Sequence, residues 1–233
     1  STLELARKPE LLAETPAEEA FTRHGSGPFA EFLASLGLWN LDAPGQGLHP
    51  IDCLLPVLRQ RPWLVAHVNY PAPRHLPLLA ESGASVVYCP RASAYFGHPE
   101  AGHMPHAYRE MLEAGVNVAL GTDSIICLDT PDRISVLDEM RLLHRRDGVE
   151  PLTLLRMATV NGAGALEIDP GLVTLQPGPL AGLITVEIDP ADRTPPLAQA
   201  LERDDPIRWV AGPCEAEAQA RSNTFPTVDA VRP

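Results

Sequence analysis

The chain has 233 residues, enough for one large domain or two small ones, and 45% of them are hydrophobic, which suits a sizeable core. Its net charge of −12 argues against nucleic acid and anionic membrane surfaces as partners. No apolar run approaches the roughly 18–20 residues of a membrane span. The four cysteines include no Cys-x-x-Cys pair, so a reducing, cytoplasmic location is expected.

The N-terminal part of the chain predicts short elements separated by proline and glycine. A short strand over residues 11–13 is expected to end at Glu14. Thr15, Pro16 and Glu18 then predict a helix start, with an N-cap, a first-turn proline and a capping box. The other expected elements here are a helix over 3–8, helix over 16–37 broken at 25–27, a loop over 39–50 and a helix over 51–60.

From residue 63 the chain alternates between apolar runs and amphipathic segments. Strands are expected over 63–67, 84–89 and 116–120, helices over 73–82, 106–114, 131–146 and 151–166, and a loop over 91–105. Alternating strands and helices predict an α/β fold with a parallel sheet and right-handed crossovers.

The pattern changes after residue 171. A hairpin is expected over residues 172–186, and residues 207–210 predict one further strand. The chain therefore divides into a region of strands and helices over residues 1–170 and a β region with a loosely held tail over residues 171–233.

Three polar residues each end an expected strand, just before a loop. They are Glu14, His67 and Asp123. In a parallel barrel such positions converge on one face. Two carboxylates and an imidazole at one place favour metal-assisted hydrolysis, with Asp123 on the metal, Glu14 moving protons and His67 orienting the reacting atom.

Each of these residues also has a structural interpretation. Asp123 before Ser124 is typical of a turn or an N-cap, and a single strand histidine such as His67 is often a satisfied core residue. Glu14 before a helix start favours the helix N-terminus. The coincidence of all three supports the functional interpretation.

His98, His103 and His106 crowd another segment, but their spacing is not a compact ligand pattern, and no independent metal site is expected there.

Five stretches of the chain form a recognisable combination. They are Ala-His-Val-Asn at 66–69, Val-Tyr-Cys-Pro-Arg at 87–91, Glu-Ala-Gly-Val-Asn-Val-Ala-Leu-Gly-Thr-Asp-Ser at 113–124, Met-Ala-Thr-Val-Asn-Gly-Ala at 157–163 and Leu-Gln-Pro-Gly-Pro-Leu-Ala-Gly-Leu at 175–183. Together they resemble the amidohydrolase superfamily, and in particular its cytosine deaminase and chlorohydrolase-like branch, which includes adenosylhomocysteine, guanine and aminofutalosine deaminases.

The resemblance implies the C-terminal part of a (β/α)₈ TIM-type barrel, followed by strands of an accessory β-sandwich. It implies a hydrolase that deaminates a purine-like or other small heterocyclic substrate with one divalent metal ion, zinc or iron. Asp123 would be the metal ligand, His67 would contact the attacking water or the substrate, and Glu14 would be the proton shuttle. The segment from Arg91 onwards is expected to cover the pocket, and the residues expected to bind substrate are Arg91, Tyr95 and His98.

The departures from the family pattern bear on metal binding. Leu11 stands where the family has a metal-binding histidine, and no His-x-His pair occurs in the chain. Residues 1–170 are too few for a whole barrel of roughly 250 residues. We therefore expect weak metal binding and an incomplete record of a longer protein. A genuine half-barrel, whose open strand edges would favour homo-oligomers, and a non-catalytic scaffold that has lost its metal site are the alternatives.

Overall fold

The computed structural model describes residues 10–40, 42, 44–130 and 133–211. Its centre is a four-stranded parallel sheet in the order β1-β2-β3-β4, which confirms the predicted α/β fold with a parallel sheet. The strands are β1 (Glu10–Leu12), β2 (Leu64–His67), β3 (Ser85–Tyr88) and β4 (Asn117–Leu120). The helix expected over 3–8 lies outside the described residues.

The register of the sheet brings the carboxyl ends of its strands to one edge. Leu12 of β1 lies opposite His67 of β2, and Tyr88 of β3 lies opposite Leu120 of β4. All of β2 and the last three residues of β4 are buried, as expected for a parallel sheet covered by helices. The residues that follow these strands therefore emerge close to one another.

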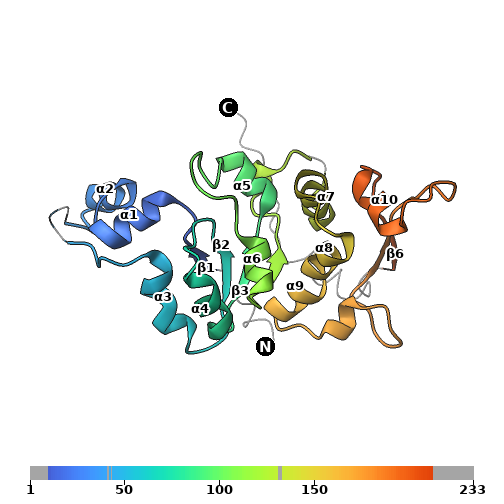
Figure 1. Cartoon of the computed structure of the whole chain (residues 1–233), viewed down its shortest axis with the longest axis horizontal. Coiled ribbons are helices and arrows are strands. Elements are labelled where there is room, and N and C mark those ends of the chain that lie inside the picture. The colour runs from blue at the N-terminus through green and yellow to red at the C-terminus, as the bar shows by residue number, and fades with distance from the viewer. Residues whose placement is uncertain (1–9, 41, 43, 131–132, 212–233) are drawn as a thin grey trace, which may run out of the picture.

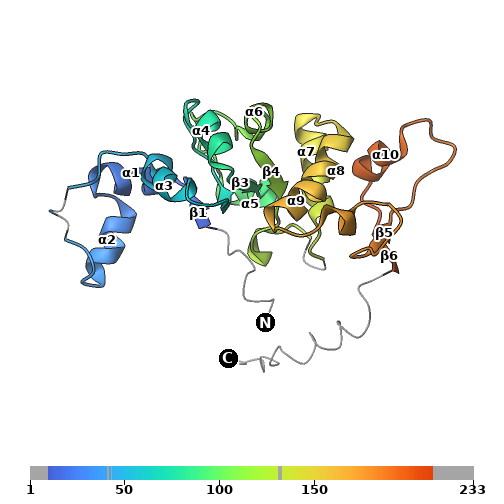
Figure 2. The ribbon, with the colours of Figure 1, turned by 90° about the horizontal axis from the view of Figure 1, so that it is seen from below.

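The helices α1 and α2 lie at one end of the molecule, the sheet lies in the middle and α10 lies at the other end (Figure 1). Their bounds are α1 Pro16–His24, α2 Pro28–Ser35, α3 Pro50–Leu58, α4 His75–Ser82, α5 Pro90–Phe96, α6 Tyr108–Glu113, α7 Val136–Asp147, α8 Pro151–Ala158, α9 Val160–Ala165 and α10 Pro196–Glu202, with 3₁₀ turns η1 Ile125–Cys127 and η2 Pro170–Val173. Helices α4 and α6 contact each other on the same side of the sheet (Figure 2). No helix of the described part has the length and apolar character needed to cross a bilayer.

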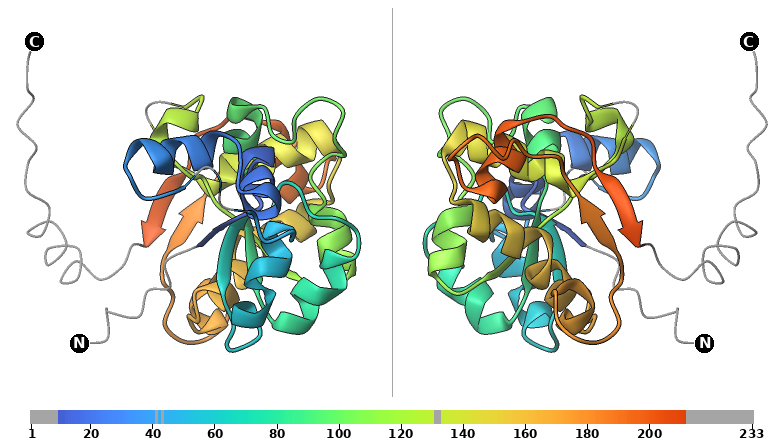
Figure 3. Two further views of the ribbon diagram at one scale, coloured as in Figure 1. Left: turned by 90° about the vertical axis from the view of Figure 1, so that its left-hand side faces the viewer. Right: turned by 90° about the vertical axis from the view of Figure 1, so that its right-hand side faces the viewer.

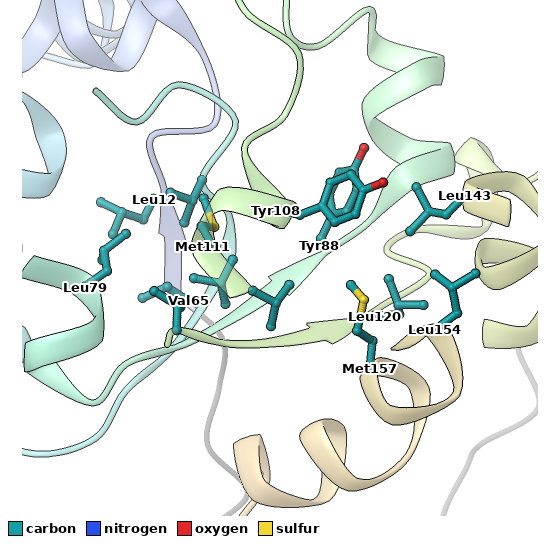
Figure 4. Packing of buried hydrophobic residues seen from close by; sticks show 14 of the residues in the cluster. Leu12, Val65, Leu79, Tyr88, Tyr108, Met111, Leu120, Leu143, Leu154 and Met157 are labelled. Atoms are coloured by element: carbon teal, nitrogen blue, oxygen red, sulfur yellow. The ribbon is translucent and has the colours of Figure 1, made fainter. Parts of the chain in front are cut away.

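The main hydrophobic core lies between the sheet and helices α4, α6, α7 and α8 (Figure 4). Its fully buried side chains include Leu12, Val65, Leu79, Tyr88, Met111, Leu143, Leu154 and Met157. Burying one such leucine or methionine contributes about 1.5–3 kcal/mol relative to an exposed position. This packing determines the direction of the strands and hence the position of the residues that follow them.

The segment after β3 differs from the prediction, because residues 91–96 are helical instead of a loop. Pro90 occupies the first turn of α5, and Gly97 ends the helix in the left-handed conformation, with φ 70°. A proline at the start and a glycine at the end are typical helix boundaries, so the sequence carried this signal. The helix expected over 151–166 is also divided, because Thr159 leaves the helical region with φ −122° and ψ −89°.

The hairpin expected over residues 172–186 is wrong. Residues 170–173 form a 3₁₀ turn, in which the Asp169 carboxylate accepts the amide hydrogen of Gly171. The strand β5 (Leu183–Thr185) instead pairs antiparallel with β6 (Arg208–Ala211), the expected extra strand (Figure 3). The described residues show neither a closed barrel nor a sandwich, so both stay predictions, as does a domain boundary near residue 170.

Candidate functional site

The three polar residues predicted at strand ends lie together. His67 is the last residue of β2, and its Nε2 is 3.7 Å from Oε1 of Glu14 and 4.0 Å from Oδ2 of Asp123. The imidazole is buried, with 5% of its side chain exposed, whereas the two carboxylates are 26% and 30% exposed. The cluster is thus a buried imidazole beside two carboxylates that water can reach.

The backbone around this cluster is strained. Ala13, His67, Val68 and Asp123 have φ values of 48°, 70°, 53° and 56°, in the left-handed region that residues other than glycine rarely adopt. In the described part of the chain, Glu167 is the one other non-glycine residue with a positive φ. Each such conformation costs about 1–3 kcal/mol and persists where surrounding contacts enforce it, often at functional sites.

Hydrogen bonds between the turns after β1 and β2 help to enforce these conformations. The amide of Val68 donates to the carbonyl of Leu12 at 3.0 Å, and the amide of Tyr70 donates to the carbonyl of Ala13 at 3.2 Å. The side chain of Asn69 donates to the carbonyl of Glu14 at 3.1 Å. The backbones that carry Glu14 and His67 are therefore fastened to each other.

Glu18 binds the turn after β1 from the first turn of α1. Its carboxylate accepts the amide hydrogens of Ala13 at 3.0 Å and Glu14 at 2.9 Å. Thr15 caps the helix as predicted, since its hydroxyl accepts the amide hydrogen of Glu18 at 3.3 Å. The capping box differs from its usual form, because Glu18 binds the two residues before the N-cap. Burial raises the pKa of the Glu18 carboxyl.

His106 contacts the turn after β2, and the sequence pattern does not predict this contact. Its Nε2 lies 2.8 Å from the carbonyl oxygen of His67, and its ring stacks on Tyr88 with centroids 3.8 Å apart. Burial lowers the pKa of His106 to about 4. The sequence signal was a histidine at the start of an amphipathic helix, which by itself does not indicate a contact with another strand.

Asp123 follows a close approach between β3 and β4. The amide of Gly121 donates to the carbonyl of Tyr88 at 2.9 Å, and a Cβ on Gly121 would lie 2.5 Å from Cγ1 of Val87. Only glycine fits there without rearrangement. Burial raises the pKa of the neighbouring Cys89 thiol, and the charge of Asp123 adds to this effect. A buried thiol of this kind stays protonated at neutral pH.

The Arg91 side chain points into the protein. Its Nε binds Glu139 at 2.5 Å, and its Nη1 binds Asp129 at 3.0 Å and the Thr130 hydroxyl at 2.9 Å. Arg91 is 6% exposed and Glu139 is fully buried. The guanidinium therefore joins α5 to α7 and to residues 129 and 130, which precede α7. Substrate binding by Arg91 stays a prediction, and these contacts do not favour it.

His98 and Tyr95 also lie apart from the cluster of three. The Nδ1 of His98 is 2.8 Å from the Tyr70 hydroxyl. The His98 ring also borders a pocket of about 700 Å³, which His106 lines as well. The residues that line this pocket do not include Glu14, His67 or Asp123. Tyr95 is exposed and packs its ring edge-to-face with Phe96. Neither contact tests the predicted roles in substrate binding, and both roles stay predictions.

The described residues do not by themselves fit a bound metal ion. They contain no group of three or more His, Cys, Asp or Glu side chains arranged to hold one. The distances of 3.7 Å and 4.0 Å from His67 Nε2 to the two carboxylates exceed the roughly 3.4 Å between donors in a tetrahedral zinc site. Asp123 stays the predicted ligand, and the described residues form no three-ligand group around it.

The chain is similar to two curated proteins. The chain is 31% identical over 192 residues, 79% of its length and 39% of the relative's, to a 5-methylthioadenosine/S-adenosylhomocysteine deaminase of Moorella thermoacetica. It is 30% identical over 161 residues, 67% of its length and 31% of the relative's, to an S-triazine hydrolase of Gordonia rubripertincta. The chain thus spans less than half the length of these curated relatives.

Solved structures show the same fold. The atrazine chlorohydrolase of Arthrobacter aurescens TC1, crystallised with zinc, superposes with a TM-score of 0.56 at 23% identity, over 84% of this chain and 40% of that one. A sequence model of the amidohydrolase family matches residues 47–213, a segment that contains His67 and Asp123 but not Glu14. The matched segment covers more than half of the sequence, and the chain belongs to the amidohydrolase family.

Proposed function

We propose that this chain is part of a hydrolytic deaminase that replaces an amino group on a purine-like ring by oxygen. The observation that carries the proposal is the position of His67 Nε2 within 4.0 Å of carboxylate oxygens from both Glu14 and Asp123. Relatives named for deamination of 5-methylthioadenosine and S-adenosylhomocysteine support this substrate class. The fold shared with a chlorohydrolase makes a triazine the second substrate class to test.

The proposed chemistry adds water to the ring carbon that carries the amino group and then expels ammonia. Glu14 is partly exposed, so it can move one proton of the attacking water to the ring nitrogen and then move the proton of the new hydroxyl to the leaving amino group, which departs as ammonia. His67 is buried and held by its backbone, so it can orient the water or hydrogen-bond the oxygen that gains charge. A metal would be expected to activate the water, but the described residues supply too few ligands to assign it a step.

The alternative is a non-catalytic member of the family. The lack of a three-ligand group among the described residues favours it, as does the exposed Leu11 at the family's histidine position. The two functions differ in one measurable property, because a scaffold releases no ammonia from any of these substrates.

The test measures ammonia release from 5-methylthioadenosine, S-adenosylhomocysteine and an aminotriazine by the full-length protein. We expect Glu14→Gln, His67→Asn and Asp123→Asn each to lower kcat by about 10²-fold or more, as is usual for groups that transfer or position protons. Glu81→Gln is the control, since Glu81 is an exposed residue whose carboxylate lies 3.7 Å from Arg59. Wild-type activity in the Asp123 or Glu14 variant would contradict the proposal, and no turnover by the wild type would favour the scaffold.

A further inference from the structure

We propose that His106 is a positioning residue, which holds the strained peptide of His67 and thereby the orientation of the His67 imidazole. The inference rests on the proposed function in one respect, because it assigns His67 a part in the reaction. His106 itself is 39 residues from His67 in sequence and reaches it through one hydrogen bond, from Nε2 to the carbonyl oxygen of His67 at 2.8 Å.

The His67 carbonyl stands where the sheet no longer provides a partner from β3. The pairing between β2 and β3 ends at Ala66 and Val87, one residue before His67. At His67 the backbone enters the left-handed region, with φ 70°, and stays there at Val68, with φ 53°. A β-branched residue in this conformation is a genuine outlier, so the turn needs contacts that hold it. The His106 ring provides such a contact at the point where the strain begins.

Other contacts hold the ring of His106 in turn. It stacks on Tyr88 with an angle of 15° between the planes, and both residues are buried. The Tyr88 hydroxyl accepts a hydrogen bond from Nη2 of Arg146 at 3.2 Å, and Arg146 is paired with Asp147. A continuous set of contacts therefore runs from α7 through β3 to the end of β2.

The tautomer of His106 follows from these contacts. Because Nε2 donates to a carbonyl oxygen, Nδ1 of the neutral ring carries a lone pair. This Nδ1 is buried, and none of the described residues gives it a hydrogen-bond partner. Burial lowers the pKa of this ring to about 4, so it is neutral at ordinary pH. A neutral buried donor fits a role in holding the His67 peptide, with no part in proton transfer.

The experiment compares His106→Phe with His106→Gln in the full-length protein. Phenylalanine keeps a flat ring to stack on Tyr88 but has no donor, whereas the glutamine amide can place an N–H close to the position of Nε2. We expect the phenylalanine variant to lower kcat at least 10-fold with KM within about 2-fold, and the glutamine variant to restore most of kcat. The control is His103→Phe, because His103 lies in the same segment and packs against Tyr70.

A second measurement does not depend on activity. In the phenylalanine variant, hydrogen exchange at the Val68 amide, which binds the Leu12 carbonyl, should accelerate at least 10-fold, and the ¹⁵N shifts of the His67 ring should change. The glutamine variant should resemble the wild type in both. These changes in a protein that shows no turnover would support the positioning role while the proposed function fails. Wild-type exchange, ring shifts and kcat in a folded phenylalanine variant, or equal losses in both variants, would overturn the inference.

Discussion

Glu18 holds the backbone of Glu14: its Oε2 accepts the Glu14 amide hydrogen at 2.9 Å, and its Oε1 accepts that of Ala13 at 3.0 Å. The turn between these residues is left-handed at Ala13. Glu14 and His67 are thus held in similar ways. In each case the chain makes a left-handed turn at the end of a parallel strand, and a polar side chain from outside the sheet binds the backbone of that turn. Glu18 does so after β1 and His106 after β2.

We expect Glu18→Ala to lower the free energy of unfolding by about 2–4 kcal/mol, since it removes two hydrogen bonds to a charged acceptor and leaves two amides unpaired. Urea denaturation measures the change. Glu18→Gln keeps one acceptor oxygen and should give an intermediate loss. The control is Glu19→Ala on the same helix, whose partly exposed pair with Arg23 is expected to contribute less than about 1 kcal/mol. Equal effects from Glu18→Ala and Glu19→Ala would contradict the assignment.

The ion pair between Arg91 and Glu139 joins segments 48 residues apart and is buried at both ends. Burial raises the pKa of Glu139, and its hydrogen bonds to Arg91 partly offset this effect. We expect Glu139→Ala to lower the free energy of unfolding by about 3–5 kcal/mol, because the buried Arg91 guanidinium would lose its buried carboxylate partner.

The matched control is Asp204→Ala, which removes the exposed partner of Arg145 and should change stability by less than about 1 kcal/mol. Thermal and urea unfolding of both variants give the comparison. A loss below about 1 kcal/mol in Glu139→Ala would show that the buried pair contributes no more than the exposed one.

The third prediction concerns pH and His75, which is fully buried at the start of α4. Burial lowers its pKa to about 4, and the facing His49 and Arg74 act in the same direction, whereas Asp52 opposes them. Between pH 6.5 and about 4 the unfolded chain binds a proton here that the folded chain does not. Stability is therefore lost as the pH falls through this window, by at most about 3.5 kcal/mol from this residue.

His75→Asn tests this dependence. The Nδ1 of His75 accepts the Ala72 amide hydrogen at 2.9 Å, and the asparagine oxygen can take that place without titrating. Urea denaturation at pH 7, 6, 5 and 4 should show a shallower loss of stability in the variant. An unchanged slope would mean that His75 does not contribute to it.

The fourth prediction concerns zinc. The described residues contain no three-ligand group, so calorimetric titration of the 233-residue chain should show binding weaker than micromolar. Asp123→Ala should weaken it further if Asp123 is a ligand. Micromolar or tighter binding that Asp123→Ala abolishes would mean that this chain forms a metal site on its own.

Sequence patterns predicted much of the fold because they act over short distances. Apolar runs such as the one before Gly121 indicate buried strands, and a polar residue just after each run lies at the carboxyl edge of a parallel sheet. The sequence therefore identified Glu14, His67 and Asp123 as neighbours. In the structure, carboxylate oxygens of Glu14 and Asp123 lie within 4.0 Å of His67 Nε2. The predicted hairpin failed because the strand Leu183–Thr185 pairs with a segment more than twenty residues away.

The sequence by itself determined the four parallel strands, most of the helices between them and the position of three polar residues at strand ends, since apolar spacing and turn residues encode them. It missed the helices Pro90–Phe96 and Pro196–Glu202. Only the tertiary structure decided which groups hold the three polar residues. The contact of His106 with the His67 carbonyl and the inward direction of Arg91 join segments 39 and 48 residues apart. Such contacts depend on how helices pack on the sheet, because a hydrogen bond requires positions accurate to a fraction of an ångström.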